Sequence, residues 1–253
     1  MNKEELLFYD EYESFYTMAE KSDAFREFCK DAFGEDFSQD GFSDISQVNM
    51  ILPYISGGDK AHVLDIGCGN GKMLKYLQRK TGCRISGFDY SANAILTAKK
   101  KAGALDDFRE GIIGEISYPE ESFDVITSMD TMYFAQDMSA FVSQLIKWLK
   151  TGGVFFVAYQ EGDVMPKTQN EHKTVLAEAF KSNGIEYSVT NITKQTYEML
   201  KKKREAAILH QDEFIKEGNK EWLDMLMWQT ECTTADYEVF AKEMSRYIYI
   251  VKK

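Results

Sequence analysis

One stretch predicts the fold of this chain: Val63-Leu64-Asp65-Ile66-Gly67-Cys68-Gly69-Asn70-Gly71-Lys72. An apolar run over residues 62–66 ends in three glycines at alternate positions, and an amphipathic segment follows at once. This order predicts a buried strand, a tight turn and then a helix. Glycines let a ligand press on bare backbone, and the first turn of a helix offers unpaired N–H groups. The stretch therefore predicts a ligand site at the carboxyl end of a parallel strand.

The spacing of the glycines bears on which ligand binds. A dinucleotide-binding turn reads G-x-G-x-x-G, whereas Gly67, Gly69 and Gly71 alternate here. Asp65 stands two residues before the first glycine, where a pyrophosphate needs no carboxylate. A ligand with an amino group or another cationic end has a use for that acid. The pattern V-L-D-x-G-C-G resembles motif I of the class I S-adenosylmethionine-dependent methyltransferases.

Composition limits the classes of protein that this chain can represent. Its 253 residues are 44% hydrophobic, enough for the core of one large domain or of a domain with a cap. A formal net charge of −11 disfavours binding to nucleic acid, because that binding neutralises phosphates. The basic runs 99–101 and 201–204 lie in helical patterns, where solvated faces are the simpler interpretation.

Cysteine usage and hydropathy indicate the compartment. The four cysteines are widely separated, without C-x-x-C spacing, so neither a metal site nor a disulfide framework is predicted. No apolar run has the length of a signal peptide or of a membrane span. These features predict a cytoplasmic protein that interacts with neither membrane nor nucleic acid. The sequence carries no signal for oligomeric state.

Strand and helix patterns alternate over residues 62–160, which predicts a cofactor-binding core. Short apolar runs between helical segments indicate parallel strands that are buried on both faces. Right-handed crossovers then give an α/β, Rossmann-like, doubly wound sheet. Five strands are predicted here and two more beyond, at residues 62–66, 84–89, 107–111, 123–129, 154–159, 185–193 and 247–251.

Helical patterns flank this core within a single domain, residues 1–253. Residues 1–61 are aromatic-rich, and this pattern is consistent either with a lid over the cofactor or with a plain packing layer on the sheet. Residues 194–245 form a long helical insertion before the last strand, where we expect a substrate cap. Aromatic residues of both segments are candidates for its lining, although such stripes are more often core: Tyr12, Tyr16, Tyr197, Trp222 and Trp228.

The family resemblance adds implications of its own. In these methyltransferases the last strand inserts antiparallel between the fifth and sixth, so the resemblance implies seven mostly parallel strands in the order 3-2-1-4-5-7-6. It also implies S-adenosylmethionine as cofactor and S-adenosylhomocysteine as product. The first strand and its turn would contact that cofactor through Asp65, Gly67, Cys68, Gly69 and Gly71. For Cys68, packing in the turn is the simpler role, rather than nucleophilic chemistry.

Asp89 is the second anchor, because it ends the predicted second strand twenty residues after Gly69. An acid there accepts hydrogen bonds from both hydroxyls of a ribose. The same position suits the ribose of NAD, and a helix N-terminus alone also favours an acid. Tyr90, next to it, would stack on the adenine.

A third stretch, Gly114-Glu115-Ile116, resembles the family's G-D-[AI] segment, in which an acid takes the adenine amino group and the next backbone N–H takes a ring nitrogen. Glu115 replaces the usual Asp and is one methylene longer. A plain surface acid is the alternative interpretation of Glu115.

The loop after the predicted fourth strand is expected to lie over the reactive centre. Met129 and Asp130 would flank the methionine end of the cofactor, although Asp130 equally suits a helix cap. Tyr133, Asp130 and Tyr159 are the weak catalytic candidates, and no residue is identified as a general base.

Together these features predict methyl transfer to a small-molecule acceptor by in-line displacement. A silent module that binds S-adenosylmethionine or S-adenosylhomocysteine is the first alternative, and an NAD-type oxidoreductase is the second. The cofactor core is common to N-, O-, S- and C-methylation, so it does not identify the acceptor.

Overall fold

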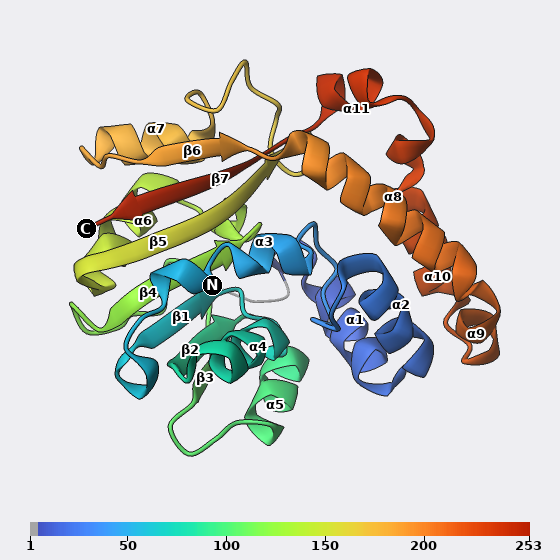
Figure 1. Cartoon of the computed structure of the whole chain (residues 1–253), viewed down its shortest axis with the longest axis horizontal. Coiled ribbons are helices and arrows are strands. Elements are labelled where there is room, and N and C mark those ends of the chain that lie inside the picture. Colours follow the sequence, from blue (N-terminus) through green and yellow to red (C-terminus); the bar gives the residue numbers. More distant parts are fainter. Residues whose placement is uncertain (1–4) are drawn as a thin grey trace.

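A seven-stranded sheet forms the centre of the computed structural model, which describes residues 5–253 (Figure 1). The strand order is β3-β2-β1-β4-β5-β7-β6, and neighbours run parallel except at β7, which is antiparallel to β5 and β6. The predicted sheet is thereby confirmed. The strands are β1 (His62–Ile66), β2 (Arg84–Asp89), β3 (Asp107–Glu110), β4 (Phe123–Met129), β5 (Leu149–Glu161), β6 (Ser188–Asn191) and β7 (Ser245–Lys252).

Four strands, β3, β5, β6 and β7, differ from the prediction at one or both ends, and the differences are largest at β5 and β6. Strand β5 begins at Leu149 rather than at residue 154, because its amino end pairs with the carboxyl end of the chain. The Gly152 N–H donates to the Lys253 carbonyl oxygen over 2.8 Å, so this glycine lies within the sheet. Strand β6 covers only Ser188–Asn191 at the sheet edge, with three of its four side chains exposed.

Helices cover both faces of the sheet because β-strand side chains alternate between them. Leu64 and Ile66 of β1 pack toward α6 and α7, whereas Val63 packs toward α3, α4 and α5. These helices are α3 (Ile45–Asn49), α4 (Lys72–Thr81), α5 (Ala92–Lys100), α6 (Met138–Trp148) and α7 (Val175–Ser182), with short 3₁₀ turns at η2 (Leu52–Tyr54), η3 (Gly58–Lys60) and η4 (Met132–Phe134).

The remaining helices pack on one another beside the sheet and share a core of their own (Figure 1, right). Phe25 and Phe28 of α2 contact Phe214 of α9 in this core, with ring centroids 6.5 and 6.0 Å apart. This helical layer joins both ends of the sequence: α1 (Tyr9–Lys21), α2 (Asp23–Phe33), α8 (Thr193–Leu209), α9 (Gln211–Lys216), α10 (Lys220–Gln229), η5 (Glu231–Thr234) and α11 (Tyr237–Glu243).

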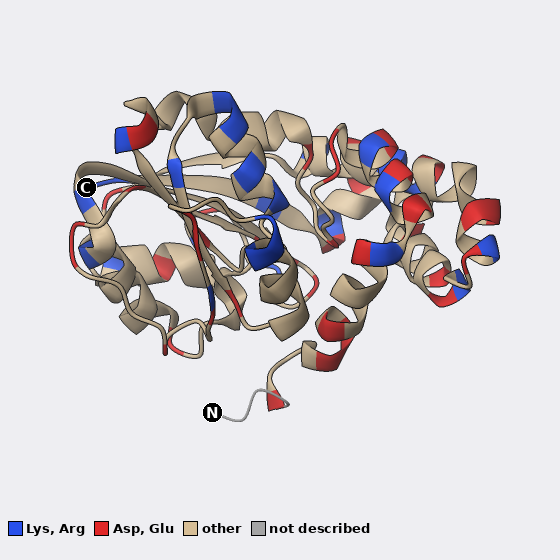
Figure 2. Ribbon diagram, turned by 90° about the horizontal axis from the view of Figure 1, so that it is seen from below, with Lys and Arg blue, Asp and Glu red and all other residues tan. Residues whose placement is uncertain are grey.

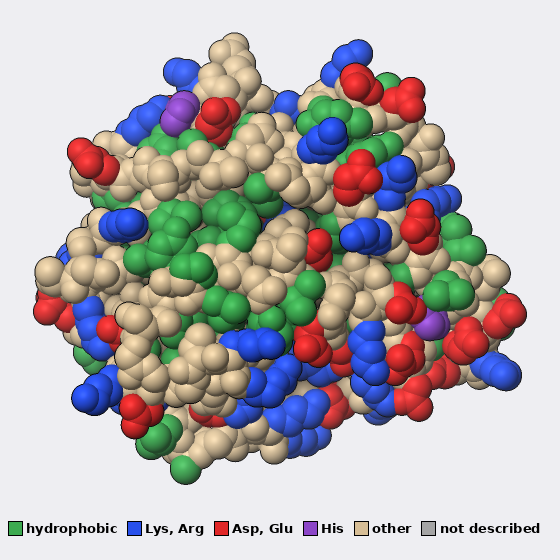
Figure 3. Space-filling view, viewed as in Figure 1, with side chains coloured by type: hydrophobic (Ala, Val, Ile, Leu, Met, Phe, Trp, Pro, Cys, Tyr) green, Lys and Arg blue, Asp and Glu red, His purple; other side chains and the backbone are tan. Residues whose placement is uncertain are grey.

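Charged side chains of both signs are interspersed over the helical layer (Figure 2). Lys and Arg side chains gather over α4 and α5 on the face seen in Figure 3. Several of them pair with acids, as in Lys75–Asp106 and Lys101–Glu20. Over residues 5–253, no helix is both long and apolar enough to cross a bilayer.

Candidate functional site

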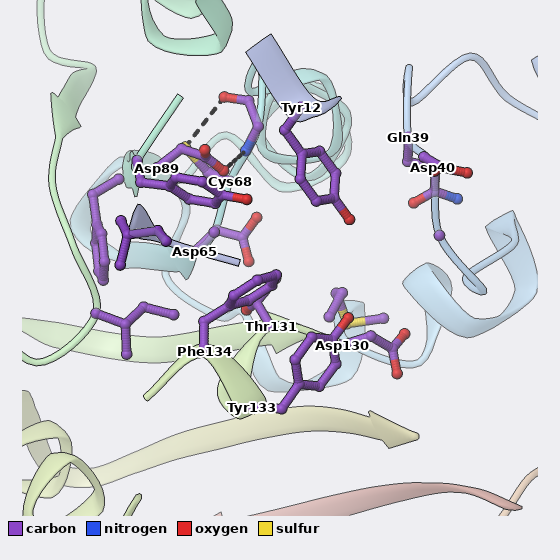
Figure 4. A pocket seen from close by; sticks show the side chains of 18 of the residues that line it. Tyr12, Gln39, Asp40, Asp65, Cys68, Asp89, Asp130, Thr131, Tyr133 and Phe134 are labelled. Carbon is purple, nitrogen blue, oxygen red and sulfur yellow. Dashed lines mark hydrogen bonds between the residues drawn. The ribbon is translucent and has the colours of Figure 1, made fainter. Parts of the chain in front are cut away.

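A cavity of about 340 Å³ opens at the carboxyl ends of β1, β2 and β4, where the strand order changes direction. A ligand site is expected at this point of a doubly wound sheet. Helix α1 and residues 37–42, which we call the strap, also line it. Figure 4 shows side chains from these elements converging on one space.

The glycine turn presents bare backbone to the cavity. Gly67 and Gly69 have φ of 70° and 53°, in the left-handed region that favours glycine. A Cβ on Gly67 would lie 2.5 Å from Thr131 Cγ2, and a Cβ on Gly69 would lie 2.2 Å from the Tyr16 hydroxyl. A residue with a Cβ at either position would therefore displace Thr131 or Tyr16, whereas glycine leaves the backbone of the turn bare.

Asp65 lies within this cavity and is 3% exposed. Its Oδ1 accepts a hydrogen bond from the Thr127 hydroxyl over 2.7 Å. Burial raises the pKa of this carboxyl to about 7, against the Thr127 hydrogen bond, which lowers it. A cation in the cavity would restore the ionised form.

Asp89 is held from two sides at the end of β2. Its Oδ2 accepts from the Gly69 N–H and its Oδ1 from the Ser91 N–H, both over 2.9 Å. Burial raises its pKa to about 6, and these two bonds oppose that shift. Each oxygen keeps a second acceptor site. Ser91, not Asp89, caps α5, so a capping role does not account for this acid.

An aromatic cluster lines the cavity beyond Asp89. The Tyr90 hydroxyl donates to the Leu7 carbonyl oxygen, and its ring lies 5.7 Å from that of Phe134. Tyr12 of α1 meets both rings edge-on, at 6.1 and 6.5 Å. Tyr133 also lines the cavity, and Figure 4 shows its ring projecting into it.

Asp130 forms a buried ion pair that the sequence interpretation missed. It is 5% exposed and its φ is 59°. Arg246 of β7 donates to both of its carboxylate oxygens over 2.6–3.1 Å. Asp130 does not cap η4, which has no side-chain cap, so that interpretation is wrong. The one available signal was a single arginine in the otherwise apolar run of the last strand.

Arg246 also anchors the strap. Its guanidinium donates to the Phe42 carbonyl oxygen, to Gln47 Oε1 and to Ser43 Oγ. Lys203 of α8 holds the strap from another direction through Asp40. The strap has no hydrophobic periodicity, which explains why Gln39 and Asp40 were not identified from the sequence.

The structure brings most of the predicted cofactor residues together. Those that line the cavity are Asp65, Gly67, Cys68, Gly69, Asp89, Tyr90, Met129 and Asp130, joined by Tyr133, Tyr12 and Tyr16. Cys68 is 7% exposed, and burial raises the pKa of its thiol, which fits packing within the turn.

Other predicted residues lie outside the cavity. A Cβ on Gly71 would meet Phe108 and Ala98, so this glycine serves the packing of α4. Glu115 is exposed, and the Ile116 N–H donates to the Ile112 carbonyl oxygen. Ile112 and Ile113 line the cavity in their place.

Several aromatic candidates also belong elsewhere. Tyr159 is fully buried in the core beneath α6 and α7. Tyr197 packs on Phe240, and Trp222 packs on Phe15 with centroids 5.7 Å apart. Trp228 is 71% exposed. None of these four lines the cavity. Helix α8 of the insertion packs on α2, and residues of the strap line the cavity instead.

The residues present fit a nucleoside that carries a cationic group. A cradle without Cβ atoms, a carboxylate oriented by two N–H donors and a second buried carboxylate share one cavity. Comparison with known proteins agrees: residues 64–157 match the family model described as a methyltransferase domain. Residues 64–157 are thus similar to a methyltransferase domain, and the strand order is that of the Rossmann-like methyltransferase fold.

Proteins similar to this chain include phosphoethanolamine N-methyltransferase 1 of Arabidopsis thaliana, which is 33% identical over 129 residues. The matched residues are 50% of this chain and 26% of that protein. A ubiquinone biosynthesis O-methyltransferase of Pasteurella multocida is 29% identical over 74% of this chain and 79% of its own length. The chain spans about a quarter to two fifths of the first curated relatives that it matches.

Among solved structures, the fold is similar to Haemonchus contortus phosphoethanolamine N-methyltransferase 2 in complex with phosphomonomethylethanolamine and S-adenosylhomocysteine. The TM-score is 0.75 at 19% identity, over 95% of this chain and 59% of that one. At this identity the likeness establishes the methyltransferase fold alone.

Proposed function

We propose that this protein transfers the methyl group of S-adenosylmethionine to a small-molecule acceptor by in-line displacement. The observation that carries the proposal is the Asp89 carboxylate, fixed by the Gly69 and Ser91 N–H groups at the edge of a cavity that continues past Asp65 toward Tyr133. The bound cofactor supplies a methyl group that its sulfonium already activates.

The chain's own residues bind, orient and exclude water. Asp89 accepts the ribose hydroxyls through its remaining acceptor sites, and Asp65 faces the cationic amino end. Helix α1 covers the turn, because the Tyr16 hydroxyl abuts Gly69. Holding the two reactants together in this way supplies an entropic gain that reaches about 7–11 kcal/mol in favourable cases.

The proposal specifies the acceptor only as a small molecule. The relatives are named for phosphoethanolamine, for a sterol and for ubiquinone biosynthesis, so their names share only small-molecule methyl transfer. The methyltransferase match favours this function over an NAD-type oxidoreductase. The silent binding module differs from the proposed enzyme only in turnover.

Calorimetric titration with S-adenosylhomocysteine and, separately, NAD tests the proposal. We expect the first to bind and the second not to bind. Asp89→Ala should weaken S-adenosylhomocysteine binding by about 10- to 100-fold, because hydrogen bonds to a charged group contribute about 1.5–3 kcal/mol. Asp107→Asn, at an exposed ion pair on β3, is the matched control. Binding of NAD, or equal affinity of both variants, would contradict the proposal.

A further inference from the structure

The far end of the cavity has a chemistry different from that of the glycine turn. Figure 4 shows the rings of Tyr12 and Tyr133 projecting into the space between Asp65 and the strap residues Gln39 and Asp40. We call the set Tyr12, Gln39, Asp40, Asp130 and Tyr133 the acceptor end. Its side chains are aromatic, amide or carboxylate.

The charges around the cavity are of one sign. Among the described residues that line it there is no lysine, arginine or histidine, although the chain has 30 Lys and Arg and 3 His. The acids that line it are Glu5, Asp40, Asp65, Asp89 and Asp130. The ribose hydroxyls of the proposed cofactor account for Asp89 and its cationic amino end accounts for Asp65, whereas Asp40 and Asp130 lie at the acceptor end.

The nearest arginine has no donor left for an anionic ligand. A guanidinium has five N–H groups. Arg246 directs Nε and one hydrogen of Nη2 to Asp130, its second Nη2 hydrogen to Ser43, and its two Nη1 hydrogens to Phe42 and Gln47. Its side chain is also fully buried.

Lys203 is likewise occupied by hydrogen bonds behind the cavity wall. It is 2% exposed, and its Nζ contacts Asp40 Oδ1 at 3.3 Å and Gln229 Oε1 at 2.8 Å. The Gln229 amide donates in turn to Asp40 Oδ2 over 2.9 Å. A phosphate or carboxylate in the cavity would meet Asp40 and not the lysine behind it.

The two tyrosines report the same negative potential. Burial raises the pKa of Tyr12, and Asp40 is the next largest cause, followed by other acids. Burial also raises the pKa of Tyr133, with further contributions from Tyr12, Asp130, Asp163 and Asp40. An anionic ligand would add to this potential, whereas a cationic one would relieve it.

We propose, on the basis of the methyl transfer proposed above, that the acceptor is a small amine without a phosphate, sulfate or carboxylate group, bound between Tyr12 and Tyr133. Aromatic faces attract ammonium groups. The carboxylates of Asp40 and Asp130 line the cavity, whereas their ion-pair partners Lys203 and Arg246 do not. Among residues 5–253, none that lines the cavity offers an anionic group a charge partner, and burying such a group unpaired is costly.

The reaction balances without a general base from the protein. The ammonium first releases one proton to water. The lone pair of the neutral amine then forms the new C–N bond, and the S–C bond breaks with its electron pair left on sulfur. The positive charge passes from sulfur to nitrogen, so the net charge within the carboxylate-lined cavity is unchanged by the transfer.

Binding of charge-matched probes tests this inference. Protein saturated with S-adenosylhomocysteine is titrated with benzylamine and with benzoate, and turnover is compared for ethanolamine and phosphoethanolamine. We expect benzylamine to bind at least about tenfold more tightly than benzoate, and phosphoethanolamine to be the poorer acceptor. Equal or tighter binding of benzoate, binding of neither probe, or preferred turnover of phosphoethanolamine would overturn it.

A charge introduced into the wall provides the matched variant. Gln39→Lys should lower the affinity for benzylamine and raise that for benzoate, each by about tenfold. Gln211→Lys adds the same charge at the exposed start of α9, where screening removes its effect. Unchanged probe affinities in Gln39→Lys would also overturn the inference. Failure to bind S-adenosylhomocysteine would instead contradict the proposed function, so the two failures are distinguishable.

Discussion

Arg246 gives the most demanding prediction, because one buried side chain joins β7, the loop after β4 and the strap. Arg246→Met removes every donor to Asp130 described above and leaves that carboxylate buried at 5% exposure. Breaking a buried ion pair from one side costs about 3–5 kcal/mol. For a chain of this length, that loss corresponds to a fall in Tm of about 6–20 °C.

Urea denaturation at constant pH measures the change. Asp130→Asn in the Arg246→Met background removes the stranded charge and should recover about 1–3 kcal/mol, and asparagine tolerates the positive φ of this position. Arg26→Met is the control, since its partner Asp23 is 79% exposed, and a surface pair contributes about 0–1 kcal/mol.

Arg246→Lys keeps the charge but not the five-donor fork, and should lose less stability than the methionine variant. This variant guards against the case in which Arg246→Met does not fold. The reasoning is refuted if Arg246→Met unfolds within about 1 kcal/mol of the parent, as Arg26→Met should, or if Asp130→Asn brings no recovery.

Three further predictions concern the glycine turn and its carboxylates. Gly69→Ala should weaken S-adenosylhomocysteine binding at least tenfold in calorimetry, because the added Cβ meets the Tyr16 hydroxyl. Gly184→Ala is the control and should leave binding unchanged, because Gly184 has a similar φ of 65° but no atom within 4 Å of an added Cβ. Adding Tyr16→Phe should restore part of the loss, and no restoration would contradict this steric account. Because the folded pKa of Asp65 is raised to about 7, its protonation stabilises the fold at low pH, and that stability is lost as pH rises from about 4 to 7. Asp65→Asn should therefore gain Tm relative to the parent as pH rises from 5 to 8, and a pH-independent difference would show that the carboxyl titrates normally.

The sequence was sufficient for those parts of the fold that depend on local pattern. Continuous apolar runs identified the buried strands, and alternate glycines identified the turn that the structure places against the cavity. The same logic located Asp65 and Asp89, because residues at the carboxyl ends of neighbouring parallel strands meet at one edge of the sheet.

The features that the local sequence pattern did not predict depend on contacts between residues far apart in the chain. Arg246 and Asp130 are 116 residues apart, and either residue alone reads as a surface charge or a cap. The strap carries no periodicity, and its position depends on Lys203 and Arg246, which come much later in the chain. A helix with aromatic residues on one face has the same sequence pattern whether its rings line a cavity, as that of Tyr12 does, or pack in a core, as that of Tyr197 does.

The binding mode proposed for the cofactor can be observed in a crystal structure of the protein with S-adenosylhomocysteine. We expect the ribose hydroxyls on the Asp89 carboxylate, the ligand backbone across Gly67 and Gly69, and the thioether sulfur facing the acceptor end beside Tyr133. Occupancy of any other site, or a ligand in this cavity whose ribose lies away from Asp89, would contradict it.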